Sequence, residues 1–320
     1  MDFSFRGANN RDVPRFVSAC YAGFLLAMLA CALPASTRAQ QAPGAIARDP
    51  ARDAANPAAM ETMQLPSHGA LLNALVYIAA GPGPHPIVVL LHGFPGNEKN
   101  LDLAQALRRA GWDVLYFDYR GSWGSPGDFS FTHCIEDTQA AIAYMRDPAN
   151  AKKLRADPAR IVLIGHSMGG FMANYAAAQD PKIEAVVMIS AANLGGMRAR
   201  SEAPKSSDED AVKSIAASLA AEGMAPLAGC TPESLAREIL ANHAQWDFAT
   251  NAPKLATRPI LVITSDDGLA PENEAFVAAA KKAGGTKINA AHMATDHSYS
   301  DHRIALETTV LEWLASLQKM

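Results

Sequence analysis

Short aliphatic runs alternate with longer amphipathic stretches along most of this chain. Several runs, such as residues 87–91 and 260–263, are continuous in Val, Ile and Leu. This pattern is typical of strands that are buried on both faces. The runs predict eight strands: Glu61–Leu65, Leu71–Ile78, Ile87–Leu91, Val114–Asp118, Ile161–Ile164, Ala185–Ser190, Ile260–Thr264 and Lys287–Ala291.

The stretches between the later strands carry apolar residues at the spacing of an amphipathic helix. Because strands and helices alternate, the pattern favours an α/β fold with a mostly parallel, doubly wound sheet of about eight strands. The first two strands have no helix between them, so we expect an antiparallel edge. The predicted helices are Leu101–Ala110, Cys134–Met145, Gly169–Gln179, Glu272–Ala283 and Asp301–Leu317.

Helix-forming sequence interrupts this alternation between Asn193 and Asn251. Its two helical patterns cover Asp210–Glu222 and Pro232–Ala244. An insertion at this point follows the carboxyl end of a strand, where open parallel sheets bind ligands. We therefore interpret residues 194–251 as a small helical cap. The alternative is a peripheral insertion that does not contact the pocket.

Residues 1–39 have the pattern of an export signal. Arg6, Arg11 and Arg15 precede an uncharged apolar stretch, residues 16–33, which is followed by a small-residue cleavage site. We expect the signal to be cleaved and the protein to reach the periplasm or the medium, without stable membrane insertion. The apolar stretch is just long enough for the alternative, an uncleaved membrane anchor.

The composition adds few constraints beyond these. The chain has 320 residues, of which 49% are hydrophobic and 19% charged, as expected for one large globular domain. Its net charge of −4 and its lack of basic runs exclude an evident nucleic-acid surface. Residues 40–58, rich in Ala, Pro and Gln, predict a flexible linker before a domain that covers residues 59–320. The sequence does not indicate an oligomeric state.

Two cysteines, Cys134 and Cys230, follow the predicted signal. In an oxidising compartment they are candidates for a disulfide. The sequence alone does not show whether their Cα atoms lie within bridging distance.

The segment 165–169 reads Gly-His-Ser-Met-Gly and lies between a predicted strand and a predicted helix. A G-x-S-x-G turn in this context exposes its serine at the top of a sheet. The flanking glycines are needed because a Cβ on either side would clash in so sharp a bend. Ser167 is therefore the candidate nucleophile.

A serine hydroxyl needs a base to take its proton, and the base needs a carboxylate to orient it. In hydrolases of this layout the acid and then the histidine follow the serine along the chain. Asp267, in the turn after a buried strand, is the preferred acid, with Asp266 as the alternative. His297, just before the last helix, is the preferred base. The chain also offers His292 and His302.

The three histidines near the C-terminus are spaced five residues apart, which at first suggests a metal site. Five residues rotate a helix by about 140° and take a strand to its other face, so this spacing does not gather ligands. We expect neither a metal nor a cofactor.

The anion of an acyl-transfer intermediate needs fixed donors. The Gly-rich turn 92–96 follows a buried strand and can supply the N–H of Phe94, and the residue after the nucleophile, Met168, can supply the second N–H. Aromatic residues near these turns are weaker candidates for an apolar pocket: Phe94, Trp123, Phe129, Phe131 and Trp246.

Together these motifs resemble the α/β-hydrolase superfamily from about residue 61 to the C-terminus. Residues 118–122, Asp-Tyr-Arg-Gly-Ser, and the pair Glu136-Asp137 are similar to the dienelactone-hydrolase and prolyl-oligopeptidase branches. Those oligopeptidases carry a large propeller before the hydrolase domain, whereas here only about twenty residues without a regular pattern lie between the start of the predicted linker and the first predicted strand, which makes a peptidase a weaker expectation. The matching motifs are His92-Gly93-Phe94-Pro95-Gly96, Gly165-His166-Ser167-Met168-Gly169-Gly170, Asp267 and His297.

The resemblance implies hydrolysis by a Ser-Asp-His triad. We expect an exported serine hydrolase that cleaves a small carboxylic ester through an acyl-enzyme. A peptidase or amidase would use the same triad. A non-catalytic binding protein on the same scaffold is a further alternative, although such a protein would not need all three residues.

Overall fold

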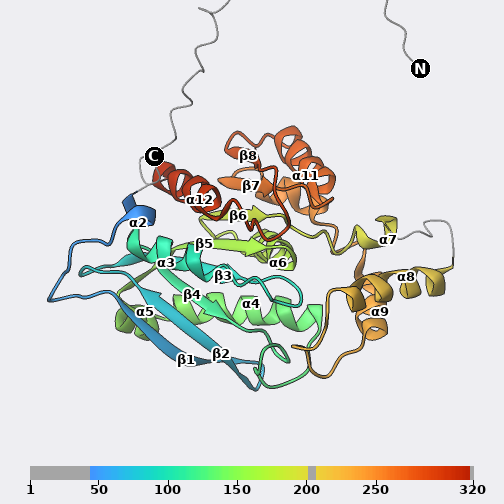
Figure 1. The fold of residues 1–320 in the computed structure, drawn as a ribbon, viewed down its shortest axis with the longest axis horizontal. Helices are drawn as coiled ribbons and strands as arrows, with labels where there is room; N and C mark the ends of the chain where they lie inside the picture. Colours follow the sequence, from blue (N-terminus) through green and yellow to red (C-terminus); the bar gives the residue numbers. More distant parts are fainter. Residues whose placement is uncertain (1–43, 201–206, 318–320) are drawn as a thin grey trace, which may run out of the picture. The chain divides into compact units, whose positions relative to one another are not determined.

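The computed structural model describes residues 44–200 and 207–317, and its centre is one twisted eight-stranded sheet (Figure 1). The strand order is β1-β2-β4-β3-β5-β6-β7-β8. The strands are β1 (Ala59–Ser67), β2 (Ala70–Ile78), β3 (His85–Leu91), β4 (Asp113–Phe117), β5 (Ala156–His166), β6 (Ala185–Ile189), β7 (Ile260–Thr264) and β8 (Ile288–His292).

The sheet is parallel except at one edge. Strand β1 pairs antiparallel with β2, and β2 pairs antiparallel with β4, whereas every later pair is parallel. All eight predicted strands are present, so the predicted fold class and the antiparallel edge are confirmed. Strands β3 and β5 lie beside each other, so the turns that follow them meet at the same end of the sheet.

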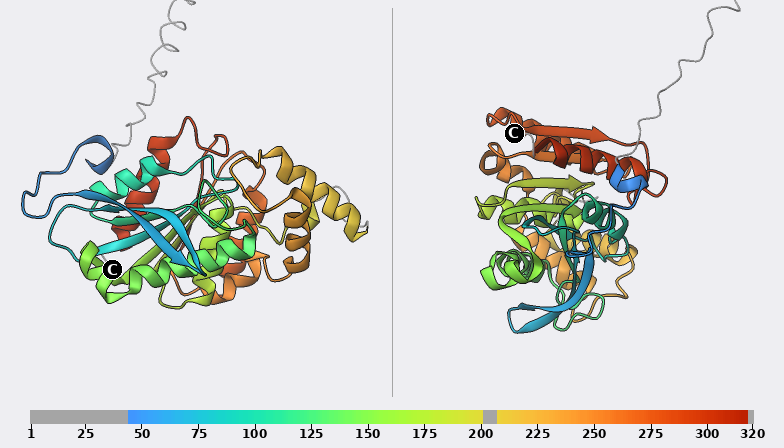
Figure 2. Two further views of the ribbon diagram at one scale, coloured as in Figure 1. Left: turned by 90° about the horizontal axis from the view of Figure 1, so that it is seen from below. Right: turned by 90° about the vertical axis from the view of Figure 1, so that its left-hand side faces the viewer.

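Alternate residues of the central strands enter two apolar layers, one on each face of the sheet. In β5, Ile161 and Leu163 join one layer, and Val162 and Ile164 join the other. Helices α4 (Phe131–Arg146), α6 (Met168–Gln179) and α11 (Ala270–Lys282) cover the first face. Helices α3 (Leu101–Arg109) and α12 (Arg303–Leu317) cover the second face (Figure 2).

Capping explains why α4 begins three residues earlier than predicted. The Ser130 side chain accepts a hydrogen bond from the N–H of His133, which satisfies one of the unpaired donors of the first turn. A further helix, α5 (Pro148–Leu154), was not predicted. Asp147 caps it, and Pro148 occupies its first position.

The described part of the predicted flexible linker, residues 44–58, is mostly exposed but contacts the domain at several residues. The short helix α2 (Gly44–Ala47) places Ala45 and Ile46 against the apolar layer beneath α3 and α12. Farther along, the carbonyl of Asn56 accepts a hydrogen bond from the N–H of Gly81 at 2.9 Å. The segment lacks a hydrophobic period, so composition alone gave no signal for these contacts. Residues 40–43 and the predicted export signal lie outside the described residues.

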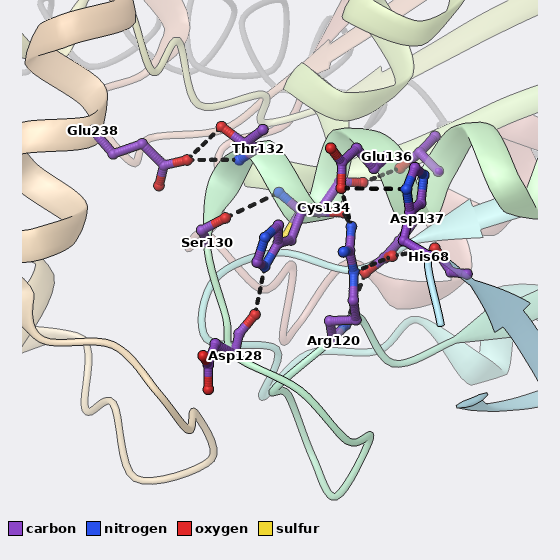
Figure 3. Close-up of polar contacts among 12 residues, drawn as sticks. His68, Arg120, Asp128, Ser130, Thr132, Cys134, Glu136, Asp137 and Glu238 are labelled. Atoms are coloured by element: carbon purple, nitrogen blue, oxygen red, sulfur yellow. Dashed lines mark hydrogen bonds and ion pairs between the residues drawn. The ribbon is translucent and has the colours of Figure 1, made fainter. Parts of the chain in front are cut away.

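The insertion between β6 and β7 forms helices α7 (Met197–Arg200), α8 (Asp208–Ala221), α9 (Pro232–Asn242), η1 (Phe248–Asn251) and α10 (Ala252–Leu255). Helices α8 and α9 pack against each other. The Glu238 carboxylate of α9 accepts hydrogen bonds from the N–H of Phe131 and from Thr132, at the start of α4 (Figure 3). An isolated β-bridge between Ser122 and Leu227 provides a second attachment. Both contacts help to hold the insertion to the domain, together with hydrogen bonds such as that from the Asn251 amide to Asn174 of α6.

The two cysteines of the described domain are free thiols, so the candidate disulfide is not formed in this structure. Cys134 is fully buried in α4, and Cys230 is half-buried just before α9. Burial raises the pKa of both thiols. Within the described ranges, we find no helix with the length and apolar character needed to cross a membrane.

Candidate active site

A sharp turn between β5 and α6 carries Ser167 in a strained conformation. Its backbone has φ 56° and ψ −122°, a region that residues with a side chain rarely adopt. A Cβ on Gly165 would collide with the backbone of Gly169, and a Cβ on Gly169 would collide with the carbonyl of Leu91. The turn predicted from the sequence is therefore tight enough to require both glycines.

Asp267 and His297 meet at the same end of the sheet. Asp267 follows β7 and is nearly inaccessible to solvent, and its Oδ2 lies 2.7 Å from Nδ1 of His297. The His297 ring is 40% exposed, in the loop between β8 and α12. Because an ionised carboxylate can only accept, Nδ1 carries the proton, and Nε2 is left as a proton acceptor.

Hydrogen bonds hold Asp267 in its ionised form. Burial alone would raise its pKa, but hydrogen bonds from His297, from the N–H of Leu269 and from the Ser190 hydroxyl hold the pKa of Asp267 well below its ordinary value. An ionised Asp267 accepts the Nδ1 proton of His297 and fixes the orientation of the ring.

The alternative acid and bases have other partners. Asp266 is exposed and lies 3.1 Å from Nε2 of His292, and Nδ1 of His302 lies 2.8 Å from Asp301. The three C-terminal histidines therefore do not converge. Among the described residues, no group of three His, Cys, Asp or Glu side chains is arranged to hold a metal ion.

His166, the second residue of the Gly-His-Ser-Met-Gly turn, contacts the loop that carries His297. Its Nε2 donates to the backbone carbonyl of His297 at 2.8 Å, and the two ring centroids are 4.7 Å apart. Burial, together with the positive charge that His297 can carry, lowers the pKa of His166 to about 3. His166 therefore stays neutral at physiological pH. No spacing pattern in the sequence predicts this contact, because the two residues are 131 positions apart.

Ser167, Asp267 and His297 line one cavity of about 320 Å³. The cap contributes part of its wall, including Leu219 of α8, so the insertion reaches the cavity. The remaining lining is mostly apolar, with polar groups from the cap: Phe94, Phe131, Met168, Ala192, Leu194, Met197, Arg200, Ser218, Glu222 and Leu269.

The two tryptophans proposed as pocket residues are not part of this lining. Trp246 is buried and packs its ring against Phe131 and Phe171. Trp123 is 38% exposed, and its indole N–H donates to the carbonyl of Pro95. Aromatic residues fill cores more often than pockets, and sequence does not distinguish the two uses.

The candidate anion donors also border the cavity. Met168 opens α6, so its N–H belongs to the first turn, where the helix itself supplies no acceptor. On the other side, Nδ1 of His92 donates to the carbonyl of Gly93 at 2.7 Å. A trans peptide points its C=O and N–H in opposite directions, so the N–H of Phe94 faces away from His92.

The family profile described as "alpha/beta hydrolase fold" matches residues 86–258, more than half of the chain. Among curated relatives, an uncharacterized protein of Mycobacterium tuberculosis is 31% identical over 133 residues, 41% of this chain and 46% of that protein. The chain thus matches less than half the length of this relative.

Solved structures show the same fold. An esterase from the archaeon Pyrobaculum calidifontis superposes with a TM-score of 0.61 and 22% identity, over 82% of this chain and 85% of that one. Est1E from Butyrivibrio proteoclasticus, solved with ferulic acid bound, gives a TM-score of 0.63 and 19% identity, over 81% and 100%. With the sheet order, the turn at Ser167 and the family match, these findings show that the chain belongs to the alpha/beta hydrolase fold family.

Proposed function

We propose that this protein is an exported serine hydrolase that cleaves carboxylic esters through an acyl-enzyme. The observation that carries the proposal is the 2.7 Å hydrogen bond between Asp267 and His297, in a cavity that these residues share with the strained Ser167. This combination supplies a nucleophile, a base and an orienting carboxylate.

In the acylation step, Oγ of Ser167 attacks the ester carbonyl carbon while Nε2 of His297 takes the hydroxyl proton. The tetrahedral intermediate then collapses. The bond to the leaving oxygen breaks, and His297 returns the proton to the departing alcohol. Asp267 stabilises the imidazolium between these events and keeps its proton on Nδ1.

In the deacylation step, water attacks the acyl carbon and gives its proton to His297. The bond to Oγ of Ser167 breaks, the serine regains its proton from His297, and the carboxylic acid leaves. The half-exposed ring of His297 is accessible to this water. Both steps place negative charge on the former carbonyl oxygen, for which the N–H groups of Phe94 and Met168 are the proposed donors.

The largely apolar cavity favours an ester with an apolar group of moderate size. A panel of p-nitrophenyl esters of increasing acyl length, run against aminoacyl-p-nitroanilides, tests the ester assignment. We expect ester turnover to exceed anilide turnover by orders of magnitude. The reverse ranking would make the protein a peptidase or amidase that uses the same residues.

Covalent labelling separates an enzyme from a binding protein on the same scaffold. A fluorophosphonate reacts with activated serines, so we expect wild-type protein to be labelled at Ser167 and the Ser167→Ala variant to remain unlabelled. A folded wild type that does not react would favour the binding protein.

Export is proposed from the N-terminal sequence alone. Mass spectrometry of the protein recovered from the periplasm or the medium tests it. We expect a mature N-terminus at Gln40. An intact Met1 in the membrane fraction would indicate an anchor instead.

A further inference from the structure

Three buried hydroxyls meet behind the proposed catalytic residues, outside the set predicted from the sequence. Oγ of Ser190 lies 2.9 Å from Oγ of Ser265 and 2.9 Å from the hydroxyl of Tyr299. All three side chains are at most 1% exposed. They come from the end of β6, the end of β7 and the loop that carries His297. The cluster thus joins the strand ends to the loop of the base.

The direction of each hydrogen bond in this cluster follows from which groups can donate a proton. The Ser190 hydroxyl also lowers the pKa of Asp267, and a hydroxyl does so by pointing its proton at the ionised carboxylate, which accepts only. Ser190 has one proton, which it must therefore donate to Asp267. Its two lone pairs remain for the protons of Tyr299 and Ser265, so all of its hydrogen-bonding capacity is used. Such a chain of aligned donors strengthens its last bond, the one to Asp267.

Backbone strain marks the same residues. Ser190 has φ 41° and Tyr299 has φ 57°, in the left-handed region that only glycine adopts freely. Such conformations persist where the surroundings impose them, and they cluster at functional sites. Glycine at position 190 would remove this strain and the hydroxyl together, so the serine is kept at a conformational cost.

We propose that Ser190 is a positioning residue of the triad: its hydroxyl, oriented by Tyr299 and Ser265, holds the Asp267 carboxylate against His297. The inference rests on the proposed function. When the imidazole becomes positively charged, the carboxylate must already lie in place, and the Ser190 hydroxyl prevents its rotation. The same bond draws charge from the carboxylate, so its loss should strengthen the attraction of Asp267 for protonated His297.

The test compares Ser190→Ala, Tyr299→Phe and the double variant in ester hydrolysis, with rates normalised to fluorophosphonate-titrated sites. We expect Ser190→Ala to lower kcat by about 10- to 100-fold, the scale for a misplaced catalytic group, with little change in KM. Tyr299→Phe should cost about 3- to 10-fold. The double variant should match Ser190→Ala, because Tyr299 acts through Ser190.

The pH profile provides a readout that a purely structural role would not move. The acidic limb of kcat/KM reports protonation of the free base, so Ser190→Ala should shift this limb to higher pH. Ser125→Ala is the matched control, since Ser125 is a buried serine with two hydrogen bonds, to Asn73 and Asp118, outside the cavity lining. It should leave kcat and the limb unchanged.

If the alanine variant does not fold, Ser190→Gly is the second variant, because glycine accepts φ 41° without strain. An active wild type with unchanged kcat and pH limb in the Ser190 variants would overturn the positioning role alone. Multiplicative losses in the double variant would also overturn it. A wild type that hydrolyses neither esters nor anilides would overturn the proposed function as well.

Discussion

Two buried carboxylates in this domain, those of Asp137 and Asp267, accept similar sets of hydrogen bonds but have different roles. Asp137 accepts hydrogen bonds from Nε and the backbone N–H of Arg120 at 2.7 and 2.8 Å (Figure 3). It also accepts one from the hydroxyl of Ser67 at 2.5 Å. Asp267 likewise accepts bonds from a serine hydroxyl, a backbone N–H and a side-chain nitrogen. We call Ser67, Arg120, Glu136 and Asp137 the Arg120 cluster.

The partner cation distinguishes the two sites. A guanidinium does not lose its proton in a protein, so the ion pairs of the Arg120 cluster persist at all ordinary pH values. They connect β1, the segment after β4, and α4. An imidazole gains and loses its proton near neutral pH, and His297 is 40% exposed at a cavity. A buried carboxylate therefore serves structure or chemistry according to whether its partner can titrate and be reached.

The largest expected effect contrasts the serines of the two sites. Ser167→Ala should lower ester turnover by about 10⁵-fold and leave the fold intact, as is typical when a nucleophile is removed. Ser67→Ala should leave turnover unchanged and lower the free energy of unfolding by about 1–3 kcal/mol, because a buried carboxylate loses a donor. Steady-state kinetics and urea unfolding of both variants measure this. Equal losses of activity in Ser167→Ala and Ser67→Ala would show that the two sites do not differ in their role in catalysis.

The next effect tests the acid. Asp267→Asn should lower kcat by about 10⁴-fold, because an amide no longer fixes the proton on Nδ1 of His297. Asp266→Asn is the matched control, one position away with an exposed carboxylate, and should change kcat less than about 3-fold. The opposite ranking would reassign the acid to Asp266.

A smaller effect belongs to the Arg120 cluster. Asp137→Asn removes the fully buried carboxylate from the Arg120 guanidinium, which is only 8% exposed and keeps only the half-exposed Glu136 as its ion-pair partner. The free energy of unfolding should fall by about 3–5 kcal/mol. Activity per titrated site should remain within about 3-fold of wild type. A large loss of activity in fully folded protein would mean that this cluster also takes part in the chemistry.

The sequence predicted those parts of this molecule that depend on local patterns. Strands buried on both faces appear as continuous aliphatic runs, which is why all eight were found. Ser167 was located because its turn has a fixed glycine spacing. The choice of Asp267 and His297 used turn chemistry and chain order, and the structure brings these two side chains together.

The supporting contacts could not be predicted, because they join distant positions through irregular backbone. Ser190 and Tyr299 are 109 residues apart, and His166 and His297 are 131 apart. Neither pair shares a helix or a strand, so no period relates them. The placement of the tryptophans failed for a related reason: a large ring fits a core or a pocket equally well, and only packing decides.

The smallest expected effect comes from a comparison of the Arg120 cluster with a buried histidine at the end of β3. The Arg120 cluster buries paired charges, whereas the end of β3 buries a neutral imidazole, His92, which is 1% exposed. Its Nδ1 donates to Gly93, and its Nε2 has no hydrogen-bond partner among the described residues. Burial, partly opposed by the charge of Asp118, lowers the pKa of His92 to about 4 from an ordinary value of 6.5.

The folded protein therefore keeps His92 neutral over a pH range in which the unfolded chain takes up a proton. This contribution to stability is present in full above pH 6.5 and is lost as the pH falls from 6.5 to about 4. At about 1.4 kcal/mol per pH unit, the full loss is about 3 kcal/mol. Urea unfolding of wild type and His92→Asn at pH 7.5 and pH 4.5 measures it. The variant should lose less stability between these values, whereas replacing the exposed His292 in the same way should not reduce the loss. If wild type and His92→Asn lost equal amounts of stability between these pH values, His92 would take up its proton in the folded domain without destabilising it.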